Sequence, residues 1–402
     1  MKSKFFRFCL LACIPLLSVA CSSSEKLSGN EFLIEGEISD VKDGVVIQLG
    51  RMDGDMGSRI ASDTLVNGRF IFKEDAISDM ERLYIIIIDE GFPPMMLNFW
   101  ATPGAKIKIK GKGKLFPAWE VKSPVAYQKE ENLYANKSRD IIAEYSRIAV
   151  EFDDMHKMAR KVSSDEARTY RNAADSLNLM INALMIKRLF ADMDVMEKTD
   201  ISPIWLNKMK ELSLTLSYSD EVNEHYGRLR KNAEALYGRM SEEDKTTPIG
   251  YQITVNLFPP PVAAIGDYMV DADFLDITGN TKHISDYSYP GKYLLLDFWS
   301  KGCGPCIMAF PEMTEISETY SENLTIISIS FDSDTGWKEA LSEHNTPWVN
   351  IRDPKAQGGL AASYGFKMMP FYVMISPEGR VVDKWTGFGN GYIKRKVSEN
   401  VK

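Results

Sequence analysis

The amino-acid sequence predicts an α/β domain at the C-terminal end of the chain, preceded by a small antiparallel β module and an α-helical segment. Three observations support this division. Short β-branched or alternating runs separated by turn residues fill positions 30–124. Glycine and proline are absent from positions 125–202. After position 262, apolar runs of strand length alternate with helical patterns, which is typical of an α/β domain.

The length and composition are those of an ordinary globular protein. A chain of 402 residues accommodates roughly two or three domains. Its hydrophobic fraction of 44% and charged fraction of 26% exclude disordered and collagen-like proteins. With 48 Lys and Arg against 56 Asp and Glu, the net charge is −8, so we expect no nucleic-acid partner. Five cysteines are too few for a disulfide scaffold.

The first twenty residues have the three-part organisation of a secretory signal peptide. Three basic residues precede an apolar run at 8–17, which is too short for a membrane-spanning helix. The sequence Leu17-Ser18-Val19-Ala20-Cys21 is similar to the lipobox of bacterial lipoproteins, whose cysteine is acylated when the signal is removed. We therefore expect a signal peptide at 1–20, lipidation of Cys21 and a polar tether at 21–29. The resulting location is the cell envelope, lipid-anchored at the periplasmic face of the outer or inner membrane or at the cell surface.

Positions 30–124 predict a β-sandwich-like module of antiparallel strands, to which the sequence assigns no function. Asn67-Gly68 stands between two short β runs, and this dipeptide is a strong signal for a two-residue hairpin turn. The clearest strand candidates are Val45–Leu49, Arg69–Phe72, Leu83–Ile88 and Ala105–Ile109.

Positions 125–247 predict an α-helical segment of three or more helices. The 78 residues from Val125 to Ser202 contain neither Gly nor Pro, which is improbable for strands or loops. Ser163 followed by Glu166 predicts a capping box at a helix start. One helical face carries apolar side chains that we interpret as a packing surface rather than a ligand groove. These are Leu177, Met180, Ile181, Leu184, Met185 and Leu189.

Positions 248–261 are predicted to be a linker, because Pro248 and the Phe258-Pro259-Pro260-Pro261 run interrupt helix and strand alike. Beyond the linker, positions 262–402 predict an α/β domain with a sheet of mixed direction. The predicted strands are Tyr293–Trp299, Leu324–Phe331, Phe371–Ser376 and Val381–Trp385, and the predicted helices are Cys306–Tyr320 and Trp337–His344.

A Cys-Gly-Pro-Cys motif, Cys303 to Cys306, follows the first of these strands and opens a helix. Unpaired backbone N–H groups and the positive end of the helix dipole favour thiolate over thiol at such a position. Cys306, three residues further on, lies about one turn away and can close a disulfide. We therefore predict that Cys303 is the exposed nucleophile and Cys306 the partly buried resolving thiol.

Other uses of a cysteine pair fit the sequence less well. A structural zinc site needs two further ligands, and the four histidines, at positions 156, 225, 283 and 344, are scattered. Haem attachment needs a histidine after the second cysteine, where Ile307 stands. A structural disulfide across four residues closes too small a loop to stabilise the fold much. We expect no metal, and no cofactor other than the redox-active disulfide Cys303–Cys306.

Together these motifs resemble the thioredoxin superfamily. The matching residues are Leu296-Asp297-Phe298-Trp299, Cys303-Gly304-Pro305-Cys306, Pro311 and Met369-Pro370. The residues before the cysteines are similar to the extracytoplasmic TlpA/ResA-like branch, in Ile265-Gly266-Asp267, Phe274-Leu275-Asp276, Gly279 and Pro290-Gly291-Lys292. This resemblance covers Val262 to Lys402. The β module and helices ahead of it are arranged as in Bacteroidota thiol:disulfide interchange lipoproteins.

The resemblance implies a thioredoxin-like fold for 262–402 and a role for each matching residue. Asp297 matches the buried acid of thioredoxins, and because burial raises a carboxyl pKa, it is a candidate proton acceptor for Cys306. An aspartate capping a turn at a strand edge is the alternative for this residue. Pro370 matches the cis-proline that faces the cysteines and presents the backbone of Met369 to an extended substrate. The other substrate-binding candidates are Trp299, Gly304, Pro305 and the groove glycine, Gly387.

Three positions depart from the family pattern. Gly302 stands where a tryptophan is expected before the first cysteine, and Ile307 replaces the usual basic residue after the second. Ala309 stands where TlpA/ResA-like proteins often carry a glutamate. We hypothesise that these changes broaden or shift substrate choice without abolishing disulfide exchange.

The predicted function is therefore an extracytoplasmic thiol:disulfide oxidoreductase. We favour a reductant, because Gly-Pro between the cysteines resembles thioredoxin, at about −270 mV, rather than a strong oxidant at about −120 mV. The expected partners are envelope proteins with thiols or disulfides, an unidentified electron donor, and the membrane through the lipid on Cys21.

Two alternatives to this function stay open. One is an AhpC/TSA-type peroxidase, with Ser300 three residues before a peroxidatic Cys303; the other is an envelope binding or sensor protein in which 30–247 is the working part.

Overall fold

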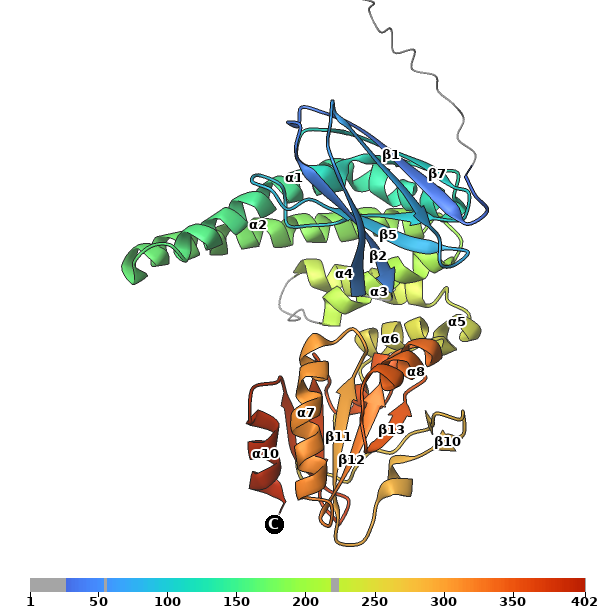
Figure 1. The fold of residues 1–402 in the computed structure, drawn as a ribbon, viewed down its shortest axis with the longest axis vertical. Helices are drawn as coiled ribbons and strands as arrows, with labels where there is room; N and C mark the ends of the chain where they lie inside the picture. Colours follow the sequence, from blue (N-terminus) through green and yellow to red (C-terminus); the bar gives the residue numbers. More distant parts are fainter. Residues whose placement is uncertain (1–26, 54–55, 218–223, 402) are drawn as a thin grey trace, which may run out of the picture.

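A computed structural model of the chain describes residues 27–53, 56–217 and 224–401 (Figure 1). The predicted signal peptide, the lipidation site Cys21 and most of the predicted tether lie outside the described residues. Within the described ranges, no helix combines the length and the apolar character needed to cross a membrane.

The N-terminal β module consists of two four-stranded sheets that share one hydrophobic core. One sheet has the order β4-β1-β7-β8 and the other β3-β2-β5-β6. The strands of the first are β1 (Glu31–Ser39), β4 (Arg69–Asp75), β7 (Lys106–Lys112) and β8 (Glu120–Lys122). Those of the second are β2 (Val46–Asp53), β3 (Met56–Thr64), β5 (Glu81–Ile86) and β6 (Leu97–Ala101).

The sandwich forms because apolar side chains alternate along its strands and meet between the sheets. Phe32 and Ile34 of β1 pack in the same buried cluster as Ile47 and Leu49 of β2. The prediction of a purely antiparallel module is wrong in one place, since β1 and β7 pair in parallel. These two strands are far apart in sequence, so the chain crosses to the other sheet and back before they pair.

The Asn67-Gly68 turn has the conformation that its sequence predicts. Asn67 and Gly68 have positive φ values of 51° and 70°, and Val66 bridges Arg69 across the turn. A Cβ atom on Gly68 would lie 2.5 Å from the carbonyl oxygen of Ile38, so the position requires glycine for space as well as for its backbone angle.

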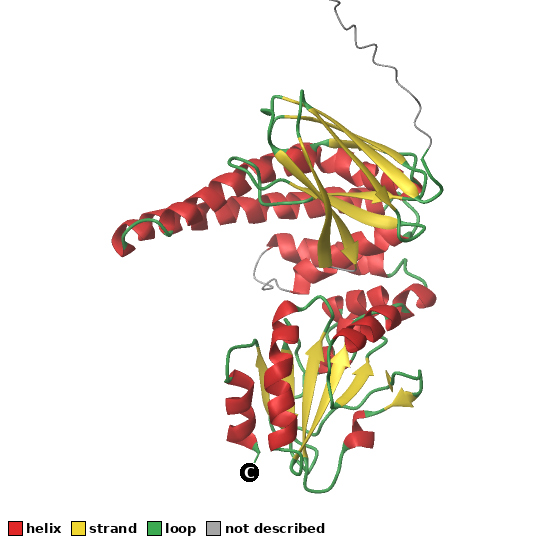
Figure 2. Ribbon diagram, viewed as in Figure 1, coloured by secondary structure: helices red, strands yellow, loops and turns green. Residues whose placement is uncertain are grey.

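The described residues of the predicted helical segment form the helices α1 (Ala126–Ala159), α2 (Ser164–Met196), α3 (Pro203–Ser217), α4 (Glu224–Tyr237) and α5 (Glu242–Thr246). The long helices α1 and α2 pack against each other and project beyond the β module (Figure 2). Ser163 does precede α2, but its side chain makes no capping hydrogen bond, so the predicted capping box is wrong. The predicted packing face is only partly buried, since Met180 is 47% exposed on the projecting part of α2.

The predicted linker at 248–261 is wrong for most of its length, because residues Pro248–Leu257 form helix α6. Proline is tolerated in the first turn of a helix, where its missing N–H has no partner to lose. Thr247 caps α6 by accepting a hydrogen bond from the Gly250 amide at 3.1 Å. The helix packs on α3 in the helical segment and on η3 (Ala356–Gly358) in the C-terminal domain, so it joins the two parts instead of separating them.

The C-terminal domain is built on a seven-stranded mixed sheet with the order β10-β9-β13-β12-β11-β14-β15. The strands β11, β12 and β13 run parallel, and β14 and β15 are antiparallel to their neighbours. The strand bounds are β9 (Phe274–Leu275), β10 (Thr281–Lys282), β11 (Tyr293–Trp299), β12 (Leu324–Ser330), β13 (Val349–Arg352), β14 (Phe371–Ile375) and β15 (Val381–Thr386).

Helices cover both faces of this sheet. Side chains of α7 (Gly304–Thr319) and α10 (Tyr392–Asn400) pack with β11, β14 and β15 in one cluster. Residues of α9 (Leu360–Ser363) pack in the cluster on the opposite face. Helix α8 (Asp334–Glu343) contributes to a smaller cluster around the cysteines. In Figure 1 the carboxyl ends of the parallel strands, and with them the start of α7, are directed toward the helical segment.

Candidate functional site

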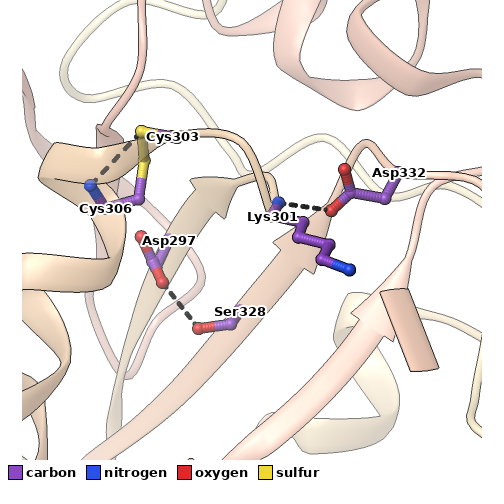
Figure 3. The surroundings of a disulfide bond; sticks show 6 residues. All are labelled: Asp297, Lys301, Cys303, Cys306, Ser328 and Asp332. Carbon is purple, nitrogen blue, oxygen red and sulfur yellow. Dashed lines mark hydrogen bonds between the residues drawn. A yellow bond between two sulfur atoms is a disulfide. The ribbon is translucent and has the colours of Figure 1, made fainter. Parts of the chain in front are cut away.

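The site begins where β11 leaves the sheet and α7 starts. Two hydrogen bonds hold the turn at 300–302. The Ser300 carbonyl accepts one from the Cys303 amide at 3.0 Å. The Asp332 carboxylate accepts the other from the Lys301 amide at 2.7 Å (Figure 3). Asp332 follows β12 and also accepts a hydrogen bond from Ser330 at 2.8 Å. The adjacent parallel strand therefore holds the turn that presents the cysteines.

Cys303 and Cys306 form a disulfide bond at the N-terminus of α7. Cys303 is the N-cap residue, and its sulfur accepts a hydrogen bond from the Cys306 amide at 3.3 Å. In the reduced protein the same N–H group and the helix dipole favour the Cys303 thiolate. The geometry therefore provides the chemistry that the motif predicts.

Cys303 is less exposed than the sequence suggests. Its side chain is 9% exposed and that of Cys306 is 1% exposed, so the predicted ranking is correct but the description of Cys303 as exposed is wrong. Phe310, Trp337 and Met369 pack in the cluster that contains both cysteines. The neighbouring Gly304 and Pro305 are exposed, so the accessible surface at the disulfide is formed by their backbone and ring.

Trp299 does not occupy a position where it could contact a substrate. Its side chain is 0% exposed, and its ring packs edge-on against Phe310 with centroids 5.2 Å apart. The prediction of a substrate-binding role is therefore wrong. Trp299, the last residue of β11, instead packs in the buried cluster that contains both cysteines.

Asp297 lies in the interior of the sheet, beneath the disulfide (Figure 3). It is 2% exposed, and burial raises the pKa of its carboxyl group to about 7, against a weaker opposing effect of a hydrogen bond from Ser328. It occupies the middle of the ladder between β12 and β14, so the alternative of a turn cap at a strand edge is wrong. A carboxyl group that titrates near neutrality beside a dithiol can exchange protons with it.

Met369 and Pro370 are joined by a cis peptide bond next to the start of β14. Met369 packs in the cluster of the two cysteines, which places the predicted pair beside the disulfide. Gly387 follows β15, has a φ of 91°, and donates its amide hydrogen to the Pro370 carbonyl at 2.9 Å. The structure therefore groups Met369, Pro370 and Gly387 on the side of the sheet edge formed by β14 and β15.

Three residues of this site were not predicted: Ser328, Asp332 and Trp348. The signal for Ser328 was present, because a hydroxyl residue stands among the isoleucines of a buried strand. The indole N–H of Trp348 donates a hydrogen bond to the Ser328 hydroxyl. The sequence carries no comparable signal for this contact, since it depends on how the loop before β13 returns to the sheet. Among the described residues, no cluster of three or more His, Cys, Asp or Glu side chains is arranged to hold a metal ion.

Comparison with known proteins gives matches in the C-terminal part of the chain. A thioredoxin-like family model matches residues 291–381. The thiol-disulfide oxidoreductase ResA of Geobacillus kaustophilus is 36% identical over 144 residues, which cover 35% of this chain and 79% of that protein. The thioredoxin of Chlorobaculum thiosulfatiphilum is 24% identical over 111 residues, covering 27% of this chain and 81% of that protein.

Solved structures also match about a third of the chain. The thioredoxin domain of a thiol-disulfide oxidoreductase from Bacteroides vulgatus is 26% identical, with a TM-score of 0.32, and covers 35% of this chain and 99% of that chain.

The relationship to ResA extends over most of that protein, and the thioredoxin-like family match at 291–381 includes both cysteines of the disulfide. The mixed sheet, the cysteine pair at the start of α7 and the cis-proline agree with it. On these grounds the chain belongs to the ResA-like thiol-disulfide oxidoreductases of the thioredoxin superfamily.

Proposed function

We propose that this oxidoreductase reduces disulfides of cell-envelope proteins outside the cytoplasm. The observation that carries the proposal is the Cys303–Cys306 disulfide, which caps α7 directly above the buried Asp297. The Gly304-Pro305 pair between the cysteines favours a reductant, because it matches that of thioredoxin.

The proposed reaction transfers two electrons to the substrate. The Cys303 thiolate attacks one sulfur of a substrate disulfide, and a mixed disulfide forms as the first substrate thiolate leaves. Asp297 then takes the proton of Cys306, whose thiolate attacks Cys303 and expels the second substrate thiol. The substrate gains two protons and two electrons, and the enzyme keeps the disulfide seen in the structure.

Gly304, Pro305 and the backbone of Met369 are the proposed contacts for an extended substrate segment. Gly304 and Pro305 are exposed beside the disulfide, and Met369 packs against the cysteine cluster. The Gly387 amide, which follows β15, donates a hydrogen bond to the carbonyl of Pro370 and so helps to fix the backbone of this surface. A donor thiol protein must return electrons to Cys303–Cys306 after each turnover.

The signal-like segment at 1–20 and the lipobox-like sequence ending in Cys21 support an envelope location with a lipid anchor. In cells supplied with an alkyne fatty acid, we expect the parent protein to be labelled and the Cys21→Ala variant to stay unlabelled. Equal labelling of both would contradict a lipid on Cys21.

The activity is tested with insulin reduction under a dithiol donor, using the parent protein and the Cys303→Ser and Cys306→Ser variants. We expect turnover by the parent alone, and accumulation of a mixed disulfide with Cys306→Ser, detected by mass spectrometry. No turnover by the parent would overturn the proposal. Hydrogen-peroxide turnover that is unchanged in Cys306→Ser would instead support a peroxidase.

The direction of electron flow is tested by equilibrating the pair with glutathione. A potential near that of thioredoxin, about −270 mV, is expected for a reductant. A value near about −120 mV would assign the protein to the oxidants.

A further inference from the structure

The Asp297 carboxylate is the end point of a chain of two hydrogen bonds, which come from the neighbouring strand β12 and from the loop that precedes β13. The Ser328 hydroxyl donates to Oδ2 of Asp297 at 2.6 Å, and the Trp348 indole N–H donates to the Ser328 hydroxyl oxygen at 2.7 Å. Ser328 is fully buried and stands directly opposite Asp297 in the parallel pairing of β11 and β12. The Trp348 ring is itself held edge-on against Phe310, with centroids 6.0 Å apart.

The donors and acceptors of these two hydrogen bonds can be assigned in one way only. An indole N–H is a donor and never an acceptor, so the Ser328 oxygen must accept from Trp348. A hydroxyl group has a single hydrogen, and with Trp348 occupying an acceptor position that hydrogen is directed to Oδ2 of Asp297. Since the carbonyl oxygen of a carboxylic acid is a better acceptor than its hydroxyl oxygen, protonated Asp297 keeps Oδ2 as the carbonyl and carries its proton on Oδ1.

Figure 3 shows that the second oxygen of Asp297, Oδ1, is directed toward the disulfide, while Oδ2 is directed toward Ser328. We propose that Ser328 and Trp348 are positioning residues that direct the proton exchanged during catalysis to Oδ1 of Asp297, on the side of Cys306. This inference rests on the proposed function, because it assigns a direction to the proton transfer that resolves the mixed disulfide.

The proton balance of that step is simple. The Cys306 S–H bond breaks and an O–H bond forms at Oδ1 of Asp297, while the Ser328 hydrogen stays on its own oxygen. The new thiolate attacks the sulfur of Cys303, and the bond between that sulfur and the substrate sulfur breaks. The departing substrate thiolate takes up a proton from solvent, and Asp297 then releases its own proton to solvent. Neither Ser328 nor Trp348 gains or loses a proton, so both act through Asp297 only.

The titratable groups that face Asp297 come from two packed elements. On α7 these are the cysteines of the disulfide, and on β14 it is Tyr372, which pairs directly with Asp297. Burial, and to a smaller extent the charges of Asp297 and Glu312, raise the pKa of Tyr372, so this phenol stays neutral at working pH. The hydrogen bond from Ser328 favours the ionised carboxyl group and so lowers the pKa of Asp297 against the effect of burial.

The test measures the decay of the mixed disulfide against pH in the parent, Ser328→Ala, Ser328→Thr and Trp348→Phe. Loss of the hydroxyl removes a hydrogen bond to a charged group, so the acidic limb of the Ser328→Ala profile should move up by about one to two pH units. Decay at pH 6 then falls about tenfold or more, with little change at pH 9. Ser328→Thr should restore the parent profile, and Trp348→Phe, which frees the hydroxyl to rotate, should give a smaller shift in the same direction.

Formation of the mixed disulfide by Cys303 should be unchanged in all three variants, and urea unfolding of each checks that it is folded. A merely structural role would lower both steps equally at every pH. A Ser328→Ala profile that superimposes on the parent, or a Trp348→Phe variant with no shift at all, overturns the proposal. Failure of the proposed function is distinguishable, because it would show as an absence of any mixed disulfide in the parent.

Discussion

Asp297 places a carboxyl group within an apolar sheet, where an ionised carboxylate is poorly solvated. Its hydrogen bond to Ser328 offsets part of that unfavourable energy but does not remove it, because the pKa of the folded protein remains at about 7. The burial of this carboxyl group is therefore unfavourable for stability, whereas the proposed proton exchange with Cys306 makes use of it. Its cost to the fold should be measurable.

The sign of that cost follows from the raised pKa. Between about pH 4 and pH 7 the folded protein binds a proton on Asp297 that the unfolded chain, at its ordinary value of 3.8, does not bind. The free energy of unfolding should therefore fall as pH rises through this window, and stay level with respect to this group above it. The total change is on the order of 4 kcal/mol.

The Asp297→Asn substitution should remove this dependence of the free energy of unfolding on pH. Urea unfolding of the oxidised parent and variant at several pH values measures the effect. We expect the variant to gain stability relative to the parent as pH rises from about 4 to 7. Parallel curves for the two proteins would show that the carboxyl group is not desolvated as the structure indicates.

At the scale of elements, the sequence predicts the strands β11, β12, β14 and β15 of the C-terminal domain and helix α7 to within two residues, since their buried faces consist of apolar runs. The short strands β9, β10 and β13 and the helices α9 and α10 were not predicted. The failures have specific causes. Pro248 was interpreted as a breaker although it begins α6, where proline is tolerated. The parallel pairing of β1 with β7 joins distant strands, and no local pattern encodes such a pairing.

Some residues of the candidate site can be predicted from the sequence and others cannot. The cysteines, Asp297 and the cis-proline were predicted because short motifs carry them. The complete burial of Trp299 depends on the packing of α7. The hydrogen bond from Trp348 to Ser328 depends on the packing of the loop before β13. Such contacts arise only from tertiary structure, so sequence reasoning could not place them.

The hairpin at Asn67-Gly68 allows a prediction with a matched control. Gly68 and Gly104 both have positive φ, but a Cβ on Gly68 meets the Ile38 carbonyl oxygen at 2.5 Å, whereas a Cβ on Gly104 meets nothing within 4 Å. We expect Gly68→Ala to destabilise the protein by about 1–3 kcal/mol more than Gly104→Ala, because only the first adds overpacking to backbone strain. Urea unfolding of the two variants measures the difference, and equal losses would contradict it.

At the scale of the whole molecule, α6 holds the N-terminal half and the redox domain together. The Gln252 side-chain amide donates to the Gln357 side-chain carbonyl at 2.7 Å, and the Lys355 ammonium lies 5.1 Å from the centre of the Tyr251 ring. A Cβ on Gly358 would lie 2.6 Å from the backbone carbonyl carbon of Tyr251. The two parts therefore meet through close backbone contact.

Gly358→Ala should force α6 away from η3, with a loss of about 1–3 kcal/mol typical of overpacking. The measurement is limited proteolysis, in which we expect faster cleavage at 258–262 than in the parent. Insulin reduction should persist, because no group at the disulfide changes. Unaltered cleavage together with unaltered stability would show that this contact is not close in solution.

The attachment of α6 has a consequence for how a protein substrate reaches the disulfide of this oxidoreductase. The carboxyl ends of β11, β12 and β13, and with them the start of α7 that Cys303 caps, are directed toward the helical segment (Figure 1). A substrate that approaches Cys303 therefore also approaches a large neighbouring body that contains no cysteine among its described residues. Two substrate disulfides of equal reduction potential can then react at different rates because of the route by which each reaches the sulfur. Under the proposed function, we expect selectivity of this kind to be kinetic and steric, and to change when the N-terminal half of the chain is altered.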